Sequence, residues 1–186
     1  AQPIISGSVA VTGWTIHSGN IWKAPVSQAL KHVFVDGGLQ EIARFPNTGW
    51  LRVDQGTSTS LTDSELTQPN GYWNGATAVI RTTNWSYDTA YVSAFNNSTL
   101  THTATGNNLG TWQWGYYLRT KLALLDAPGE WFHDRATGML YLWCPNNANP
   151  NTVLVEAAVA DFGVFVGWQR HHIKVDGLHF KHQTTA

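Results

Sequence analysis

The sequence LDAPGEWFHDRATGMLYLWC, residues 125–144, has the pattern of a β-hairpin. Two runs rich in aromatic and branched residues, 130–134 and 139–143, flank a four-residue segment that ends at Gly138. Asp134 suits the first position of a turn, and a glycine can adopt the positive φ that closes such a loop. This stretch therefore predicts a β protein.

The rest of the chain has the same character. Short apolar segments alternate with turns rich in Gly, Asn and Ser, and no segment shows a 3.6-residue apolar period of helix length. Residues 54–70 are mostly polar and without periodicity, so a long loop is expected there. Within it, Thr62 and Glu65 match a capping box, which predicts one helical turn near residues 62–66.

These patterns predict an all-β fold, and two domains are expected. Residues 1–151 should form a β-barrel or a two-sheet β-sandwich. Residues 152–186 should contain short strands about ten residues apart, a spacing that occurs both in sandwiches and in the stacked rungs of a solenoid. The strands expected in this second part cover residues 153–156, 162–166 and 173–180.

Composition narrows the classes of partner. Charged residues make up 12% of the chain, about half the roughly 25% of typical soluble domains. The formal net charge is −1 without any basic block, which argues against a nucleic-acid partner, because a phosphate backbone needs clustered Lys and Arg. No apolar run approaches the roughly 20 residues of a membrane span. The single cysteine, Cys144, cannot form an internal disulfide and is interpreted as a small buried hydrophobe.

Aromatic residues are the compositional anomaly. The chain contains 10 Trp and 6 Tyr. Such residues bury large areas in β cores, but exposed flat rings also form platforms on which the apolar faces of sugars stack. Carbohydrate is therefore the leading ligand class.

Four segments together resemble the N-terminal region of bacterial secreted right-handed parallel β-helix proteins, including glycoside hydrolases of that architecture. The segments are residues 33–47 (VFVDGGLQEIARFPN), 71–81 (GYWNGATAVIR), 125–144 and 173–182 (IKVDGLHFKH). In such proteins a β-barrel or sandwich domain is inserted near the start of the β-helix. The hairpin resembles the end of that inserted domain, and IKVDGLHF resembles the first full rung.

This resemblance implies a secreted or periplasmic protein that acts on polysaccharide. Catalytic carboxylates of the family lie on later rungs, which have no counterpart in this sequence, so no catalytic residue is carried over. The implied role is that of an ancillary domain in contact with a β-helix domain.

The candidate ligand-binding residues are aromatic and lie near glycines. Trp112 and Trp114 are two residues apart, so their rings share one face if the segment is extended, and Gln113 adds a polar group. Trp73 and Tyr72 are expected to form a second wall for a plant or microbial polysaccharide. The competing interpretation is that these tryptophans belong to the core or pack on a β-helix.

Carboxylate chemistry is the second hypothesis. Glycoside hydrolysis needs two carboxyl groups roughly 5–10 Å apart. Glu130 and Asp134 would lie about 13 Å apart on one strand face, which is too far for a retaining pair. Asp126 and Asp134 are instead expected to accept hydrogen bonds from turn amides, and Glu130 to pair with an arginine such as Arg119 or Arg135.

Metal binding is the third hypothesis. His171 and His172 would point to opposite faces of a strand, so they are not expected to chelate together. A structural Ca²⁺ held by Asp54, Asp63 and loop carbonyls is left open, without the spacing of an EF-hand. No other cofactor and no catalytic residue is expected.

The sequence thus favours a non-catalytic carbohydrate-binding or substrate-positioning domain of a polysaccharide-acting β-helix protein. One alternative is a structural spacer that caps a β-helix. Another alternative is a small glycoside hydrolase.

Overall fold

The computed structural model describes residues 2–185, which form two compact units. The first unit combines the chain up to Ile42 with the chain from Ala127 onward, and the second unit is Ala43–Asp126. The second unit is therefore inserted in sequence between two parts of the first. This division follows spatial contacts, and the boundary expected after residue 151 stays a prediction.

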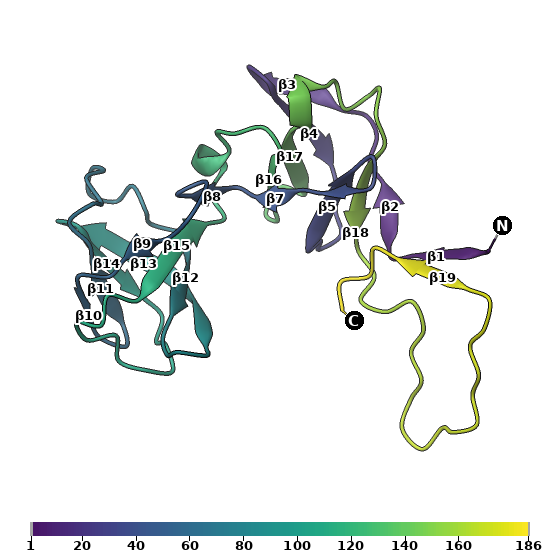
Figure 1. Ribbon diagram of the computed structural model, residues 1–186. Coiled ribbons are helices and arrows are strands. Elements are labelled where there is room, and N and C mark those ends of the chain that lie inside the picture. Colours follow the sequence, from purple (N-terminus) through teal and green to yellow (C-terminus); the bar gives the residue numbers. More distant parts are fainter. Residues whose placement is uncertain (1, 186) are drawn as a thin grey trace. The chain divides into compact units, whose positions relative to one another are not determined.

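Two sheets make up most of the first unit (Figure 1). The five-stranded sheet has the spatial order β3 (Thr15–Ser18), β4 (Ile21–Pro25), β17 (Met139–Trp143), β16 (Glu130–Asp134), β7 (Glu41–Ile42). The four-stranded sheet has the order β2 (Ser8–Ala10), β18 (Val155–Ala158), β5 (His32–Val35), β6 (Gly38–Leu39). The pairs are antiparallel except for β16 with β7, which is parallel.

One apolar core joins these two sheets. Its buried side chains come from both of them and include Ala24, Trp131, Leu140, Leu142, Val33, Val155 and Ala157. Two sheets that share one core have the architecture of a β-sandwich, so the sandwich alternative fits. No sheet formed by residues 2–185 closes into a barrel, because the edge strands of each sheet do not pair with each other.

The predicted hairpin is confirmed. β16 and β17 pair antiparallel with Trp131 opposite Leu142, and Gly138 closes the turn with a φ of 65°. Asp134 accepts hydrogen bonds from the amide of Ala136 at 3.0 Å and from the hydroxyl of Thr137 at 2.7 Å. The hydrogen bond from Thr137 is the main cause that lowers the pKa of Asp134. The expectation that this carboxylate serves its own turn is therefore confirmed.

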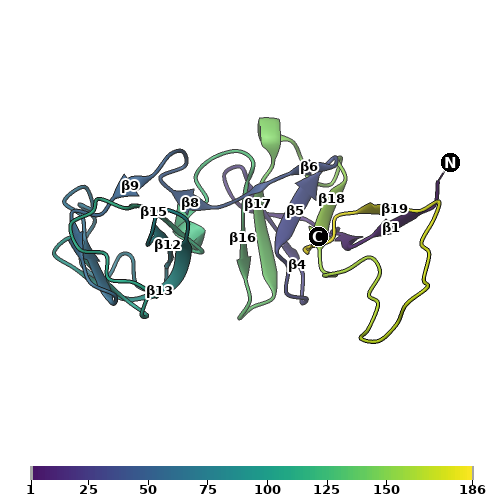
Figure 2. The same ribbon diagram turned by 60° about the horizontal axis from the view of Figure 1, so that its bottom comes forward.

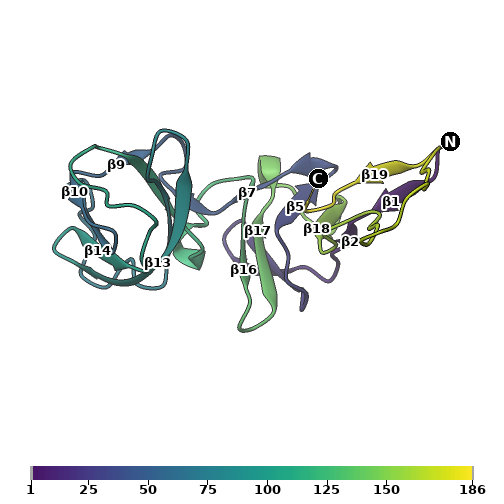
Figure 3. The same cartoon turned by 90° about the horizontal axis from the view of Figure 1, so that it is seen from below.

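The second unit contains one sheet of 8 strands. Its order is β10 (Gln55–Gly56), β11 (Ser60–Thr62), β14 (Thr99–His102), β13 (Tyr87–Asn96), β12 (Thr77–Arg81), β15 (Gly115–Arg119), β8 (Arg44–Phe45), with β9 (Leu51–Arg52) also paired to β15. Figures 2 and 3 show how strongly this sheet curves. The curvature encloses a core of its own around the buried side chains of Ile80, Phe95, Leu100, Tyr116 and Leu118.

Residues 54–70 are more ordered than expected. They contain the β10–β11 hairpin, which joins the sheet through β14. The predicted helical turn is wrong. The structure has a tight turn at this point, in which Oδ1 of Asp63 accepts the amide of Glu65 at 2.8 Å. An Asp side chain that bonds an amide two residues later forms a tight turn, which competes with helix formation.

The C-terminal segment also differs from expectation. Of the strands expected over residues 162–166 and 173–180, the structure contains β19 (His179–Lys181), which pairs parallel with β1 (Ile4–Ser6) (Figure 1). Across residues 162–178 no backbone hydrogen bond to another strand is found, and strands require such partners. A β-helix rung in this segment remains a prediction.

Helices are nearly absent from residues 2–185, where the structure has the short 3₁₀ turns η1 (Leu122–Leu124) and η2 (Pro145–Asn147). Neither has the length or the apolar composition of a membrane-crossing helix, and no other candidate occurs in this part of the chain.

Candidate functional site

The structure separates the tryptophans into core and surface residues. Trp73 is only 1% exposed; its indole N–H donates to Gln68 Oε1 at 3.0 Å, and its ring packs on Phe45 at 5.3 Å between centroids. A ligand cannot reach such a ring. Contrary to the prediction from the sequence, Trp73 therefore does not form part of a second wall of a polysaccharide site. It is a core residue of the second unit.

Tyr72 is partly exposed but faces a different set of residues. Its ring packs edge-on against Trp73, and the Lys121 ammonium lies 5.5 Å from the ring centroid. Lys121 also donates to the carbonyls of Tyr72 and Asn74, and burial lowers its pKa. Tyr72 is held by these local contacts, and its role in ligand binding stays a prediction.

Trp112 and Trp114 lie close together at the surface. Trp112 is 75% exposed and Trp114 is half-buried, with ring centroids 6.5 Å apart and planes inclined by 30°. The segment is not extended as expected, because Gln113 between them has a φ of 53°. Gly110 provides room: a Cβ at its position would lie 3.1 Å from Trp112 Cδ1.

A second aromatic group lies in the same unit and was not anticipated from the sequence. Trp50 is 43% exposed, and its ring centroid lies 5.5 Å from that of Tyr87 and 5.0 Å from that of Tyr117. The Arg44 guanidinium stacks 3.9 Å from the Tyr117 ring centroid, and its Nε donates to Pro46 O at 2.9 Å. Arg44 therefore supports the loop that carries Trp50.

A small pocket of about 90 Å³ connects these groups, and it is lined by Trp50, Arg52, Arg81, Tyr87 and Gly115. Strand pairing places these residues together, since Gly115 lies opposite Arg52 and Arg81 lies opposite Tyr87. A Cβ on Gly115 would lie 3.4 Å from Trp50, so the glycine allows the indole to cover the strand closely. The Arg81 guanidinium lies 5.3 Å from the Trp114 ring and so links the pocket to the tryptophan pair.

We call this set the aromatic–arginine surface, defined by Trp50, Arg52, Arg81, Tyr87, Trp112 and Trp114. Its members lie up to about 60 positions apart in sequence, and β9, β12, β13 and β15 bring them together. The sequence signal for three of the four additional members is a buried neighbour: Leu51 lies between Trp50 and Arg52, and Ile80 precedes Arg81. Tyr87 has no such neighbour. Such a pattern predicts that a side chain faces solvent, but it does not predict which other side chains lie beside it in space.

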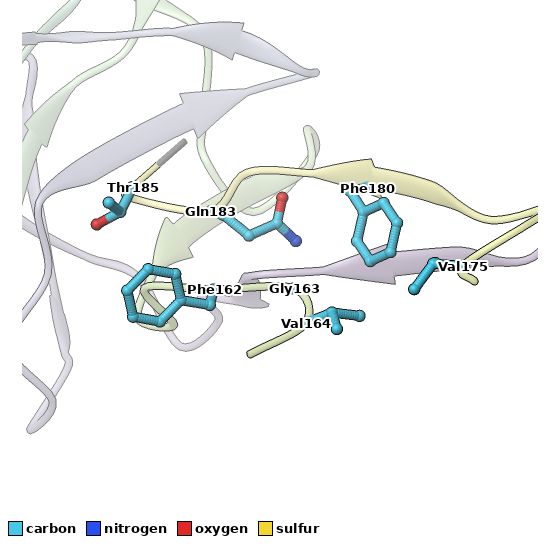
Figure 4. Close-up of a pocket in the computed structure, with 7 residues that line it drawn as sticks. All are labelled: Phe162, Gly163, Val164, Val175, Phe180, Gln183 and Thr185. Atoms are coloured by element: carbon cyan, nitrogen blue, oxygen red, sulfur yellow. The ribbon is translucent and has the colours of Figure 1, made fainter. Parts of the chain in front are cut away.

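A larger hollow of about 400 Å³ lies in the first unit, and Figure 4 shows its lining residues: Phe162, Gly163, Val164, Val175, Phe180, Gln183 and Thr185. The Gln183 side chain donates to the carbonyl of Ile5 at 3.0 Å. None of these lining residues is titratable. The hollow therefore suits apolar contact rather than acid–base chemistry.

Gly7 controls how the C-terminal segment attaches beside this hollow. A Cβ on Gly7 would lie 2.6 Å from the backbone oxygen of His182, and the Gly7 amide donates to Lys181 O at 2.9 Å. We expect Gly7→Ala to displace the segment at a cost of about 1–3 kcal/mol, because the obstructing atoms belong to the backbone. Faster hydrogen exchange at residues 179–181 would register the displacement.

Gly167→Ala is the matched control for that substitution, because nothing lies within 4 Å of a Cβ at Gly167. Its exchange rates should equal those of the unchanged protein. Unchanged exchange in the Gly7 variant would contradict the attachment.

Three carboxylates in the described part of the chain are engaged by hydrogen bonds within the fold. Glu130 is buried, with its Oε2 accepting the Ala127 amide at 3.2 Å. Asp63 is also buried, and its Oδ2 accepts the Tyr116 hydroxyl at 2.6 Å. Asp54 accepts the Ser64 amide at 2.8 Å, which is the main cause that lowers its pKa. These contacts assign the three side chains to local structure.

The residues considered for metal binding are arranged differently from expectation. His171 and His172 do not point to opposite faces, since the φ of His172 is 62° and their Nδ1 atoms approach to 2.9 Å. Within residues 2–185, no three His, Cys, Asp or Glu side chains gather as a metal site. Cys144 is buried as expected, and burial raises the pKa of its thiol to about 11.

Comparisons with known proteins give one informative likeness. No protein-family profile and no curated protein matches this sequence. A solved structure described as a glycoside hydrolase is similar to the fold, with a TM-score of 0.64 and 16% sequence identity. The likeness shows the fold alone. It covers 85% of this chain and 32% of that structure, so this chain spans about a third of its length.

Proposed function

We propose that this chain is a non-catalytic carbohydrate-binding or substrate-positioning part of a secreted or periplasmic polysaccharide-acting protein. The observation that carries the proposal is the aromatic–arginine surface, above all the exposed ring of Trp112 beside Trp114. Exposed flat rings present apolar faces on which sugar rings stack. The similarity of the fold to a structure described as a glycoside hydrolase supports the same class of ligand.

The rings are held in place before any ligand arrives. Arg81 lies against the Trp114 ring, and Gly110 leaves a close-fitting space beside the Trp112 ring. Tyr87 and Trp50 pack on each other at 5.5 Å between centroids. A surface that loses little freedom on binding retains more of its interaction free energy, which favours recognition of an extended glycan chain.

Replacing Trp112 and Trp114 together by alanine should abolish retention of the protein on polysaccharide gels. Two stacking rings would be lost, and the apolar ring surface that a sugar covers contributes about 25 cal/mol per Å². The measurement is affinity electrophoresis against xylan, pectin, galactan and cellulose, together with quenching of tryptophan fluorescence.

Trp168→Ala is the matched control, since Trp168 is 96% exposed but lies in the first unit, outside the proposed surface. Its retention should be unchanged. Retention of the double variant equal to that of the unchanged protein would refute the assignment to Trp112 and Trp114.

A second candidate function is that of a spacer that caps a β-helix domain. It is favoured by the parallel pairing of β1 with β19 and by the exposed apolar side chains of Phe165, Ile173 and Val175 in the segment that precedes β19. Such an edge offers hydrogen bonds and apolar area to further parallel strands. A spacer should leave tryptophan fluorescence unchanged with every polysaccharide of the panel.

Glycoside hydrolysis by this chain receives no support from the placement of its carboxylates. Glu130 and Asp134 are both occupied by local hydrogen bonds. Release of reducing sugar that disappears in Glu130→Gln would reverse this conclusion.

A further inference from the structure

The two arginines of the aromatic–arginine surface indicate the charge of the glycan that this surface binds. Arg52 and Arg81 line the same small pocket with Trp50 and Tyr87. Neither arginine forms an ion pair with a carboxylate among residues 2–185. Two cations in one pocket repel each other, and a ligand anion between them would relieve that repulsion.

The guanidinium of Arg81 is fixed in orientation. Its Nε donates to Thr83 O at 3.0 Å and its Nη2 donates to Asn84 O at 2.9 Å. Nη1 takes part in neither bond. Because the side chain is half-buried and held by these two bonds, its remaining donors can bind a ligand without a large loss of rotamer freedom.

Arg52 is more weakly held. Its Nη1 approaches Gln113 O at 3.4 Å, a long hydrogen bond that a ligand anion can replace. Gln113 lies between Trp112 and Trp114, so a contact at Arg52 is adjacent to the stacking rings. The charged pocket and the aromatic pair therefore form one continuous surface.

The size of the pocket defines what enters it. A volume of about 90 Å³ is well below the roughly 300–1,000 Å³ of pockets that enclose a whole small molecule. The pocket therefore suits a substituent of a sugar rather than a whole ligand. The ring would lie on the exposed indoles, with its substituent directed between the arginines.

We infer that the surface recognises acidic glycans through the carboxylate of a uronic acid residue, placed between Arg52 and Arg81. Guanidinium groups bind planar carboxylates with two parallel, charge-assisted hydrogen bonds, which are roughly twice as strong as hydrogen bonds to neutral hydroxyl groups. This inference rests on the proposed glycan-binding function of the same surface and adds the class of its ligand.

Charge composition separates this ligand from a nucleic acid, which arginine and aromatic side chains also bind. Residues 43–126 contain five Lys or Arg and five Asp or Glu, so the unit lacks the basic excess that a phosphate backbone requires. Asp88, beside Tyr87, accepts the Gly106 amide at 2.8 Å. One carboxylate bound between two arginines fits this balance better than a phosphate backbone that must be neutralised along its length.

The test compares polygalacturonate with its fully methyl-esterified form, which has the same backbone without the charge. We expect the unchanged protein to bind polygalacturonate about tenfold more tightly in isothermal titration calorimetry, with a preference that declines as sodium chloride is added. Arg52→Gln and Arg81→Gln should each remove most of this preference.

Control variants separate charge recognition from folding. Arg135→Gln removes an exposed arginine from the hairpin turn of the first unit and should leave the preference intact. Arg81→Gln also removes two loop contacts, so its circular dichroism spectrum must match that of the unchanged protein. Arg52→Gln removes one weak contact, and its effect on affinity decides the matter if Arg81→Gln is misfolded.

Each other outcome overturns a defined part of the proposal. Equal binding of the acid and its ester, lost in the Trp112 and Trp114 double variant, would refute charge recognition and retain glycan binding. Tighter binding of dextran sulfate would refute the carboxylate assignment, and tighter binding of a single-stranded oligonucleotide would refute a glycan as the ligand. No binding to any glycan would refute the proposed function itself.

Discussion

Replacing Trp131 by alanine should destabilise the first unit by about 3–5 kcal/mol, the range measured for large aromatic truncations in closed cores. Trp131 lies on β16 with 3% of its surface exposed, between the two sheets of the sandwich. Its indole N–H donates to Gln40 O at 3.2 Å. The substitution removes this bond and leaves a cavity beside Leu142, its cross-strand neighbour.

Chemical denaturation followed by circular dichroism measures this effect. The second unit has a separate core, so hydrogen exchange is needed to assign the destabilised transition to β16 and β17. Trp168→Ala serves as the control, because an exposed side chain outside the core should change stability by no more than about 0.5 kcal/mol. A similar result for both variants would contradict the position of Trp131 in the core.

The second large effect is expected in the other unit. Tyr116→Phe should lower the free energy of unfolding of residues 43–126 by about 1.5–3 kcal/mol, because it deprives a buried carboxylate of a hydrogen bond. Tyr116 is fully buried, Asp63 is 1% exposed, and the hydroxyl donates to Asp63 Oδ2 at 2.6 Å. Asp63 keeps its bond from the Glu65 amide, so the loss is partial. Thermal denaturation of both proteins at neutral pH measures the difference.

The same pair has a defined pH dependence. Burial is the main cause that raises the pKa of Tyr116 far above its ordinary value, and the hydrogen bond to Asp63 raises it further. In the unfolded chain the phenol titrates near its ordinary pKa of about 10. The stabilisation is therefore fully present below about pH 10 and is lost as the pH rises further, since only the unfolded chain then releases its proton readily.

Comparison of the unchanged protein with Tyr116→Phe isolates the contribution of this one side chain. The stability difference between the two proteins should be constant below about pH 10 and should shrink above it. Tyr87→Phe is the matched control, because its ring is exposed and its hydroxyl lies outside the core. A difference that does not change with pH would contradict the buried hydrogen bond.

Local patterns accounted for the elements that depend on nearby residues. The hairpin at residues 130–143 was predictable because its strands, its turn glycine and Asp134 are all close in sequence. The prediction that Cys144 is a small buried hydrophobe, made because no sequence pattern marks it as a nucleophile, is also confirmed. The turn near residue 63 was misassigned because Asp63 offers the backbone an alternative hydrogen-bond acceptor, which a capping-box pattern does not reveal.

Composition and local patterning by themselves determined that this protein is all-β. They also identified aromatic residues as the candidate ligand-binding groups. Only the tertiary structure decided which aromatics are available: Trp73 is in a core, whereas Trp112 and Trp50 are at the surface. Only the tertiary structure brought Arg52 and Arg81 into one pocket with them. The physical reason is that cross-strand neighbours are selected by sheet pairing between distant segments, and alternation along one strand specifies a face but not the residues that will share it.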